Sequence, residues 1–369
     1  MDFSSLTERA VKTPSTAATP SPDPSVVLMS KAQPQRSGLF PLRWQTKEKM
    51  VAVTITSVGL LSVIVLLLMG FFLFKEAFVL FYRAGFSKVI FGTQWYPTSN
   101  PPLLGMLPLI VGTLAVTALT AVIAIPLGLA TAVYVAEIAS FRVKEFLKPL
   151  IEMLASFPSV VLGFFGMVVI APMISNWLSP ILAERLPEIL KGLHLPFVST
   201  TLADFCYNKL FIASGLNMFN AALILTVRAI PVISSIAEDA LTAVPRTYRE
   251  ASYSLGANQW ETIWRSVIPA SVSGLSVAVI LGIGTIIGET MVVLMVAGGA
   301  AVFPHWIFDP VRPMPSAIAA EMAEAAHGSL HYHALFGVGA ILFVITLILS
   351  LISDFISKRY RAVRIGEKV

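Results

Sequence analysis

The chain has 369 residues, of which 56% are apolar and 13% charged, and its mean hydropathy is +0.79. In soluble domains about a quarter of the residues are charged, so this composition excludes a soluble enzyme. The single Cys206 excludes an internal disulfide framework and a metal site built from cysteines. The net charge of +5 comes from basic residues that flank apolar blocks, so we expect membrane lipid around the chain and no nucleic-acid partner.

The first 44 residues are rich in Pro, Ser, Thr and Ala and show no apolar period, which predicts a disordered cytoplasmic tail over 1–44. The first apolar run begins only after about 50 residues, so we expect a retained span and no cleaved signal peptide. Residues 45–105 are then the first transmembrane helix with its outer segment. Residues 106–357 are the main helical core, and residues 358–369 are a basic cytoplasmic tail.

Six apolar windows are long enough to cross a bilayer, which needs about 20 helical residues. This predicts an all-α polytopic bundle with six transmembrane helices. Counting Lys and Arg between the windows gives 18 on one side and 7 on the other, so we expect both termini in the cytoplasm. The windows are 51–74, 106–136, 149–173, 213–236, 269–299 and 334–356.

Proline and glycine mark irregular points in three of these spans. Pro126 and Pro158 each remove one backbone hydrogen bond, which predicts a kink in the second and the third span. The fifth span contains Gly282, Gly284 and Gly288, so we expect it to be broken or closely packed there.

The segment between the fourth and fifth spans, residues 245–268, predicts a helix-turn-helix on the cytoplasmic face. Pro245 suits the first turn of a helix, and Gly256 suits a left-handed C-terminal cap. A second helix is expected from Trp260 and is expected to stop before Pro269. Small side chains on the first helix favour a surface that docks into a groove of a cytoplasmic partner. That surface holds Tyr248, Ala251, Ser252 and Leu255, beside Glu250.

This segment resembles the coupling loop of permease subunits in ATP-binding-cassette (ABC) importers, which reads E-A-A, three residues, G, nine residues, then I-x-L-P. Here Glu250-Ala251-Ser252, Gly256 and Ser266-Val267-Ile268-Pro269 keep that spacing, while Ser252, Ser266 and Ile268 depart from the commonest letters. The resemblance implies that a partner ATPase contacts this loop. The implied coupling residues are Arg249, Glu250, Ala251, Ser252, Gly256 and Pro269.

A narrower resemblance covers residues 90–357. The runs Leu107–Leu114, Ile125–Gly128, Phe157–Ser159, Gly288–Met291 and Leu342–Thr346 are similar to the phosphate-specific permease family, of the PstC type. The resemblance implies the type I importer permease fold, with the permease core at 106–357. It also implies a second, PstA-type permease, an ATPase homodimer and an extracytoplasmic phosphate-binding protein in a prokaryotic inner membrane.

The chain contains no G-x-x-x-x-G-K-[ST] loop, so we expect no enzymatic activity of its own. ATP and Mg²⁺ are expected in the partner ATPase, and no cofactor is expected in this chain. Two other functions stay open: an ABC importer permease for another oxyanion, and an ion-coupled secondary carrier.

One position departs from the phosphate family, which often has a basic residue where this chain has Thr285. The fourth span instead contains Arg228, and a lone arginine in hydrocarbon costs about 2.5 to 3.5 kcal/mol. Glu289 is its expected counter-charge, provided that the fifth span is broken or begins below the bilayer. We therefore expect either that Arg228 supplies the positive charge of the substrate pathway, or that the pair only locks two spans. Ser234 on the same span either lines this path or bonds to its own helix.

Two further polar groups have alternative interpretations. Glu238 and Asp239 are interpreted as solvated interfacial charges or as a gate with Arg246 or Arg249. Near the last span, acidic residues and histidines raise the alternative of a metal site. No H-E-x-x-H motif is present, so no metal is expected. The loop is interpreted instead as a docking surface for the binding protein. Its residues are Glu321, Glu324, His327, His331 and His333.

Overall fold

The computed structural model describes residues 42–185, 212 and 214–365, and it divides into two parts that are treated separately, up to Leu66 and from Leu67 onward. In the first part, the described residues form the beginning of α2 (Leu42–Ala84), and the apolar side chains from Met50 to Leu66 are exposed on all sides. Such a surface suits lipid, because a helix that is apolar all round has no solvated face. Residues 1–41 of the expected tail lie outside the described residues.

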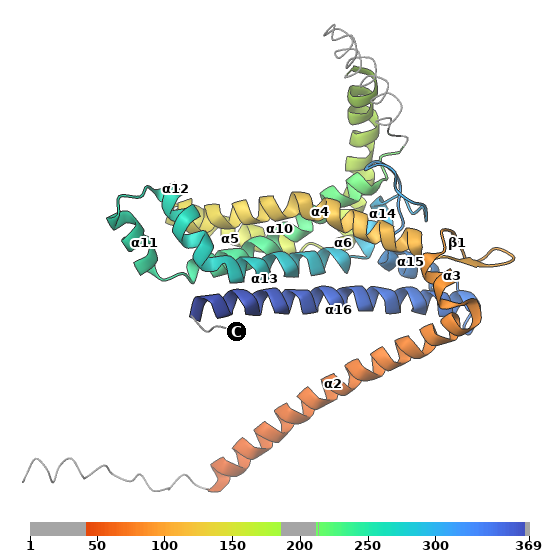
Figure 1. Cartoon of the computed structure of the whole chain (residues 1–369), viewed down its shortest axis with the longest axis horizontal. Coiled ribbons are helices and arrows are strands. Elements are labelled where there is room, and N and C mark those ends of the chain that lie inside the picture. Colours follow the sequence, from red (N-terminus) through yellow and green to blue (C-terminus); the bar gives the residue numbers. More distant parts are fainter. Residues whose placement is uncertain (1–41, 186–211, 213, 366–369) are drawn as a thin grey trace, which may run out of the picture. The chain divides into compact units, whose positions relative to one another are not determined.

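The second part is a helical bundle in which four long helices run side by side (Figure 1). They are α4 (Leu107–Val133), α10 (Met218–Thr242), α13 (Ile268–Ile287) and α16 (Leu330–Ile365). α10 has the most buried residues of the four, and it packs against both α4 and α13. The predicted basic tail begins inside α16, and its residues 366–369 lie outside the described part.

Glycines bring α4 and α13 close to α10. A Cβ at Gly128 would lie 2.8 Å from the Ile233 side chain, and one at Gly282 would lie 2.4 Å from it. Two helices therefore meet the same isoleucine from different sides. The fifth span was expected to be broken or closely packed at its glycines. It is closely packed at Gly282, and its helix ends at Gly288.

Six helices among the described residues are long and apolar enough to cross a membrane, which confirms the predicted number. The third and the fifth differ most from their predicted windows, and the third, predicted at 149–173, is displaced toward the C-terminus. Phe141–Ala155 forms a separate helix, α5, and the apolar stretch begins at Ser159. The six stretches are Lys49–Ala84, Leu107–Ile138, Ser159–Ala183, Met218–Thr242, Gln259–Ile287 and Leu330–Ile352.

The two prolines have different effects. Pro158 separates α5 from α6 (Ser159–Phe165), so the predicted kink is a break. Proline has no N–H and keeps the preceding residue out of helical conformation, and both effects end α5 before Phe157. Pro126, in contrast, lies inside α4, which continues through it. After α6 the helix runs on through η2 (Gly166–Ile170), α7 (Ala171–Met173), η3 (Ile174–Leu178) and η4 (Ile181–Arg185).

The predicted stop before Pro269 is wrong. α12 (Gln259–Thr262) continues through the π-helical turn η5 (Ile263–Val267) directly into α13. The wider π turn lies where proline removes a backbone donor, so the chain stays helical past Pro269. After α13, the chain leaves the helix at Gly288 and resumes as α14 (Met291–Val296).

The other end of the bundle is closed by short elements. These are α3 (Phe86–Phe91), α15 (Met314–Glu321) and a two-stranded antiparallel hairpin of β1 (Trp95–Tyr96) and β2 (Leu103–Leu104). Trp95 pairs with Leu104 in this hairpin and is buried. The apolar cluster under these elements also contains Leu80, Met106 and Leu335.

Candidate functional site

The structure brings Arg228 and Glu289 together inside the bundle. The distance from Arg228 Nε to Glu289 Oε2 is 2.5 Å, and the two side chains are 29% and 7% exposed. Each charge would be costly alone in a membrane interior, and the pair neutralises both. The break after α13 makes this contact possible, because Glu289 lies between Gly288 and the start of α14. The helix also begins at Gln259, well before the predicted start of the span.

The other two predicted pathway residues hydrogen-bond within their own helices. Thr285 Oγ1 donates to the carbonyl of Leu281 at 3.0 Å, and Ser234 Oγ donates to the carbonyl of Pro231 at 3.3 Å. Ser234 lines a cavity of about 10 Å³, barely enough for one water, together with Lys148 and Glu238. The structure therefore does not group Ser234 with the Arg228–Glu289 pair.

One side of α13 next to this pair is uncovered. Leu281, Gly284 and Gly288 are exposed and recur at helical spacing, so they form a single stripe that ends at Glu289. Nothing lies within 4 Å of a Cβ built at Gly284. The stripe leaves room for a second polypeptide or lipid to approach the pair.

The segment 245–268 forms the predicted pair of helices, here called the coupling hairpin. α11 (Arg246–Ser254) follows Pro245, and Gly256 has a φ of +84°, which confirms the left-handed cap. Asn258 and Glu261 then form a capping box at the start of α12. Ser252 Oγ lies 2.9 Å from Thr262 Oγ1, so this half-buried hydroxyl joins the two helices.

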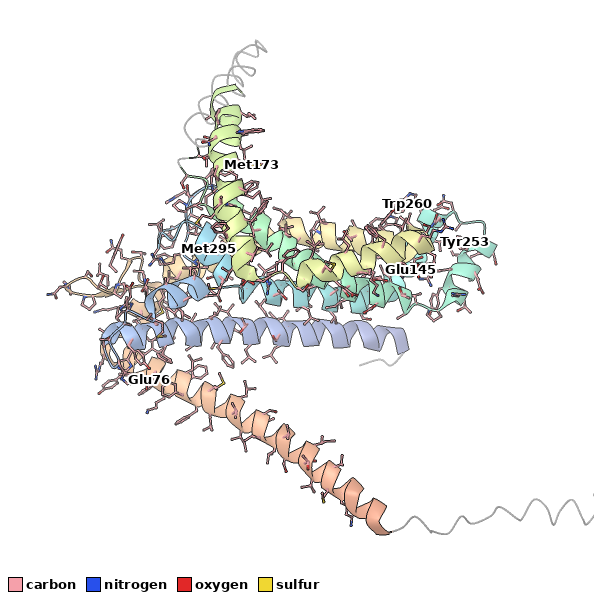
Figure 2. The ribbon with its side chains drawn as sticks, turned by 180° about the vertical axis from the view of Figure 1, so that it is seen from behind. Glu76, Glu145, Met173, Tyr253, Trp260 and Met295 are labelled. Atoms are coloured by element: carbon pink, nitrogen blue, oxygen red, sulfur yellow. The ribbon has the colours of Figure 1, made fainter. Side chains whose placement is uncertain are left out.

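The outer face of the coupling hairpin is exposed. Glu250 and Ala251 are exposed, and Leu255 is 90% exposed. Pro269, which follows the hairpin in α13, is also exposed. Figure 2 shows Tyr253 and Trp260 at this end of the bundle, with Glu76 and Met295 toward the other end. A protruding surface with exposed aromatic and aliphatic side chains is typical of a protein docking site.

Arg249 faces the bundle. Its Nη2 lies 2.5 Å from Glu137 Oε1 and its Nε donates to Glu137 Oε2 at 3.1 Å. It also donates to the carbonyls of Val244 and Leu241, at 2.8 and 3.0 Å. The hydrogen bonds to Glu137 outweigh burial and raise the pKa of Arg249. Glu137 was not predicted as a partner of Arg249, because its only signal in the sequence is a carboxylate at the end of an apolar span.

Both interpretations of Glu238 are wrong. Its side chain is buried, and it pairs with Lys144 at 2.8 Å and with Lys148 at 3.2 Å on α5, and not with Arg246 or Arg249. Burial lowers the pKa of Lys148, but the hydrogen bond and charge of Glu238 outweigh it and raise the pKa overall. Asp239, which is 72% exposed, matches the solvated interpretation.

Three of the acidic and histidine residues near the last span, Glu321, His331 and His333, contact polar side chains. Glu321 contacts Arg312 Nη1 at 2.5 Å and His331 Nε2 at 2.9 Å, and it accepts from Trp95 Nε1 at 3.1 Å. His333 Nδ1 lies 2.9 Å from Glu76 Oε2. α15 ends at Glu321, so Glu324 and His327 lie in turns. Among the described residues, no three of these side chains converge in a way that could hold a metal ion.

The family of binding-protein-dependent transport system inner membrane components matches residues 124–362. The chain belongs to this family of ABC transporter permeases. It is therefore a multi-pass inner membrane protein and the non-catalytic membrane component of its transporter. The matched range contains Arg228, Glu289 and the whole coupling hairpin.

Two curated relatives cover most of this permease. The probable ABC transporter permease protein YqgH of Bacillus subtilis is 32% identical over 83% of this chain and 89% of its own length. The phosphate transport system permease protein PstC of Pasteurella multocida is 33% identical over 74% of this chain and 82% of its own length.

Solved structures support the fold of this permease. A bacterial alginate ABC transporter in complex with an alginate-bound periplasmic protein matches with a TM-score of 0.53 at 14% identity, over 85% of this chain and 96% of that one. A second crystal structure of an alginate importer matches with a TM-score of 0.52 at 15% identity. These likenesses show the type I importer permease fold.

Proposed function

We propose that this permease is the PstC-type subunit of a phosphate importer. It moves inorganic phosphate into the cytoplasm through a pathway shared with a PstA-type permease. An ATPase homodimer, which holds ATP and Mg²⁺, drives the movement, and an extracytoplasmic phosphate-binding protein delivers the anion. Both termini are cytoplasmic. The proposal is supported by phosphate transport system permease proteins PstC from three bacteria, which are 33%, 33% and 30% identical to this chain.

The observation that carries the proposal is the Arg228–Glu289 pair at the break after α13. A guanidinium offers paired N–H donors that match the oxygens of phosphate, and Glu289 holds it in place when no anion is present. A passing phosphate competes with the carboxylate, which keeps binding weak enough for release. The exposed stripe of Leu281, Gly284 and Gly288 is where the PstA-type permease completes the pathway.

The coupling hairpin supports the ATP-driven mechanism. Its outer face docks on the ATPase through Glu250 and Leu255. A short turn at residues 243–245 connects it to α10, and its second helix continues into α13. When the ATPase dimer closes, the hairpin moves and turns these helices, so the central path opens first outward and then inward. Arg228 and Glu289 lie on or next to these two helices, so the same movement changes their separation.

The test is uptake of radiolabelled phosphate into vesicles that hold both permeases and the ATPase, with binding protein outside and ATP inside. Arg228→Ala should lower uptake by at least about tenfold, because a charge-assisted paired contact is lost. Arg228→Lys keeps the charge without the paired donors and should retain an intermediate rate. Arg142→Ala, at an exposed arginine on α5, is the matched control and should transport normally.

Unchanged uptake and folded yield in both Arg228 variants would contradict the proposed role of the pair. If the wild-type complex imports another oxyanion and not phosphate, the substrate assignment is wrong while the importer assignment stands. Uptake by this chain without the ATPase would indicate an ion-coupled carrier instead.

A further inference from the structure

Glu137 lies where α4 meets the coupling hairpin. It belongs to the π-helical turn η1 (Tyr134–Ile138), which continues α4, and its side chain is 9% exposed. π turns inside helices are frequent at functional sites, because they turn a side chain out of the regular helical register. Here the carboxylate accepts hydrogen bonds from two nitrogens of Arg249, on α11.

The same residue also contacts the second helix of the hairpin. Gln259 Nε2, at the first residue of α12, donates to the backbone carbonyl of Glu137 at 2.9 Å. Glu137, in the π turn that continues α4, therefore contacts both hairpin helices, α11 through its side chain and α12 through its main chain. Arg249 additionally donates to carbonyls at the end of α10, so three elements meet at this arginine.

Covalent connections make this contact mechanically significant. The hairpin joins α10 and α13 through the chain itself, whereas α4 is separated from it by more than a hundred residues. α4 touches α10 along its length, as at Gly128 against Ile233. Among the described residues, the polar contacts between α4 with its π turn and the hairpin are those made by Glu137.

We propose that Glu137 is a positioning residue that makes α4 move with the coupling hairpin, so that ATP hydrolysis is converted into transport. The inference rests on the proposed function, because it requires an ATPase that pushes the hairpin. The exposed docking face is separate from Glu137, so loss of its charge leaves ATPase binding and hydrolysis in place. What falls is the amount of phosphate moved per ATP.

The experiment measures ATP hydrolysis and radiolabelled phosphate uptake in the same vesicles of the complete complex. Glu137→Gln should lower the phosphate-to-ATP ratio by about fivefold or more, the range of typical coupling between sites. Gln259→Ala removes the second contact and should lower the ratio less. Glu145→Gln is the matched control, because Glu145 is an exposed carboxylate at the same end of the bundle (Figure 2) and should keep the wild-type ratio.

A purely structural role gives a different result. ATPase binding, hydrolysis and uptake would then fall together and the ratio would stay at the wild-type value, which overturns the inference. Should Glu137→Gln fail to assemble, Glu137→Asp and Gln259→Ala carry the same test, and a wild-type ratio in both overturns it.

Failure of the proposed function is recognised separately. If the wild-type complex imports no phosphate although the binding protein stimulates ATP hydrolysis, that stimulation replaces uptake as the measure of coupling. Glu137→Gln should then hydrolyse ATP at the same rate with and without binding protein, while the rate measured with binding protein stays near that of the wild type. Retained stimulation would overturn the inference independently of the substrate.

Discussion

At the scale of single residues, glycine is needed at position 256 because of its backbone conformation and not because a side chain would clash there. Its φ is +84°, and no atom lies within 4 Å of a Cβ built there. An L-residue in this conformation pays a steric cost within its own backbone, which glycine avoids. The turn between α11 and α12 therefore depends on this residue even though the site is open.

Gly256→Ala should destabilise the coupling hairpin by about 1–2 kcal/mol and weaken binding of the ATPase, measured by titrating ATPase onto the purified permeases. Gly328→Ala is the control, because Gly328 has a φ of +76° and open space near the start of α16, away from the hairpin. It should carry the same strain and leave ATPase binding unchanged. Equal ATPase binding by both variants and the wild type would show that the turn conformation is not needed for docking.

At the scale of helices, α10 is held by close approach of its neighbours. Gly128 on α4 and Gly282 on α13 both pack against Ile233, which is fully buried. Without an apolar driving force between helices in lipid, such packing is a main source of helix association. Because α10 also carries Arg228, these glycines help to set the position of the charge relative to Glu289.

Two glycines on α13 allow a matched test of this packing. Gly282→Ala places a Cβ 2.4 Å from Ile233 and should lower the free energy of unfolding by about 1–3 kcal/mol. Gly284→Ala, two residues away in open space, should be neutral or slightly stabilising, because alanine favours the helix. Thermal melting of the purified permease in detergent compares them. A Gly284→Ala variant that melts as low as Gly282→Ala would contradict the packing argument.

At the scale of the whole molecule, the distribution of Lys and Arg predicts which end faces the cytoplasm. The coupling hairpin should lie inside and the β1–β2 hairpin outside. Leu255 and Tyr96 are exposed residues at these two ends and can report on them.

The orientation is tested with single cysteines in a Cys206→Ser background. Tyr96→Cys should react with a membrane-impermeant thiol reagent in intact cells, whereas Leu255→Cys should react only after the cells are opened. Mass spectrometry of the labelled permease measures both. The reverse pattern would place the coupling hairpin outside and exclude a cytoplasmic ATPase as its partner.

Local features of the chain were predictable without any tertiary information. The length of the apolar windows predicted six spans, and the coupling segment predicted two helices joined at a left-handed glycine. These properties depend on hydrophobic length and on backbone preferences of a few neighbouring residues. Errors occurred at helix boundaries near Pro158 and Pro269, where the same residue type ends one helix and is accommodated in another by a π turn.

The sequence by itself determined the membrane class, the number of spans and the resemblance to importer permeases, because these follow from composition and local spacing. The sequence also predicted Glu289 as the counter-charge of Arg228, which the structure confirms. Only the tertiary structure decided the other charge partners, Glu137 for Arg249 and Lys144 with Lys148 for Glu238. Ion pairs depend on which helices are neighbours and at what depth their residues meet. That depth changes with each break or π turn, so it is a property of the packed bundle and not of any one segment.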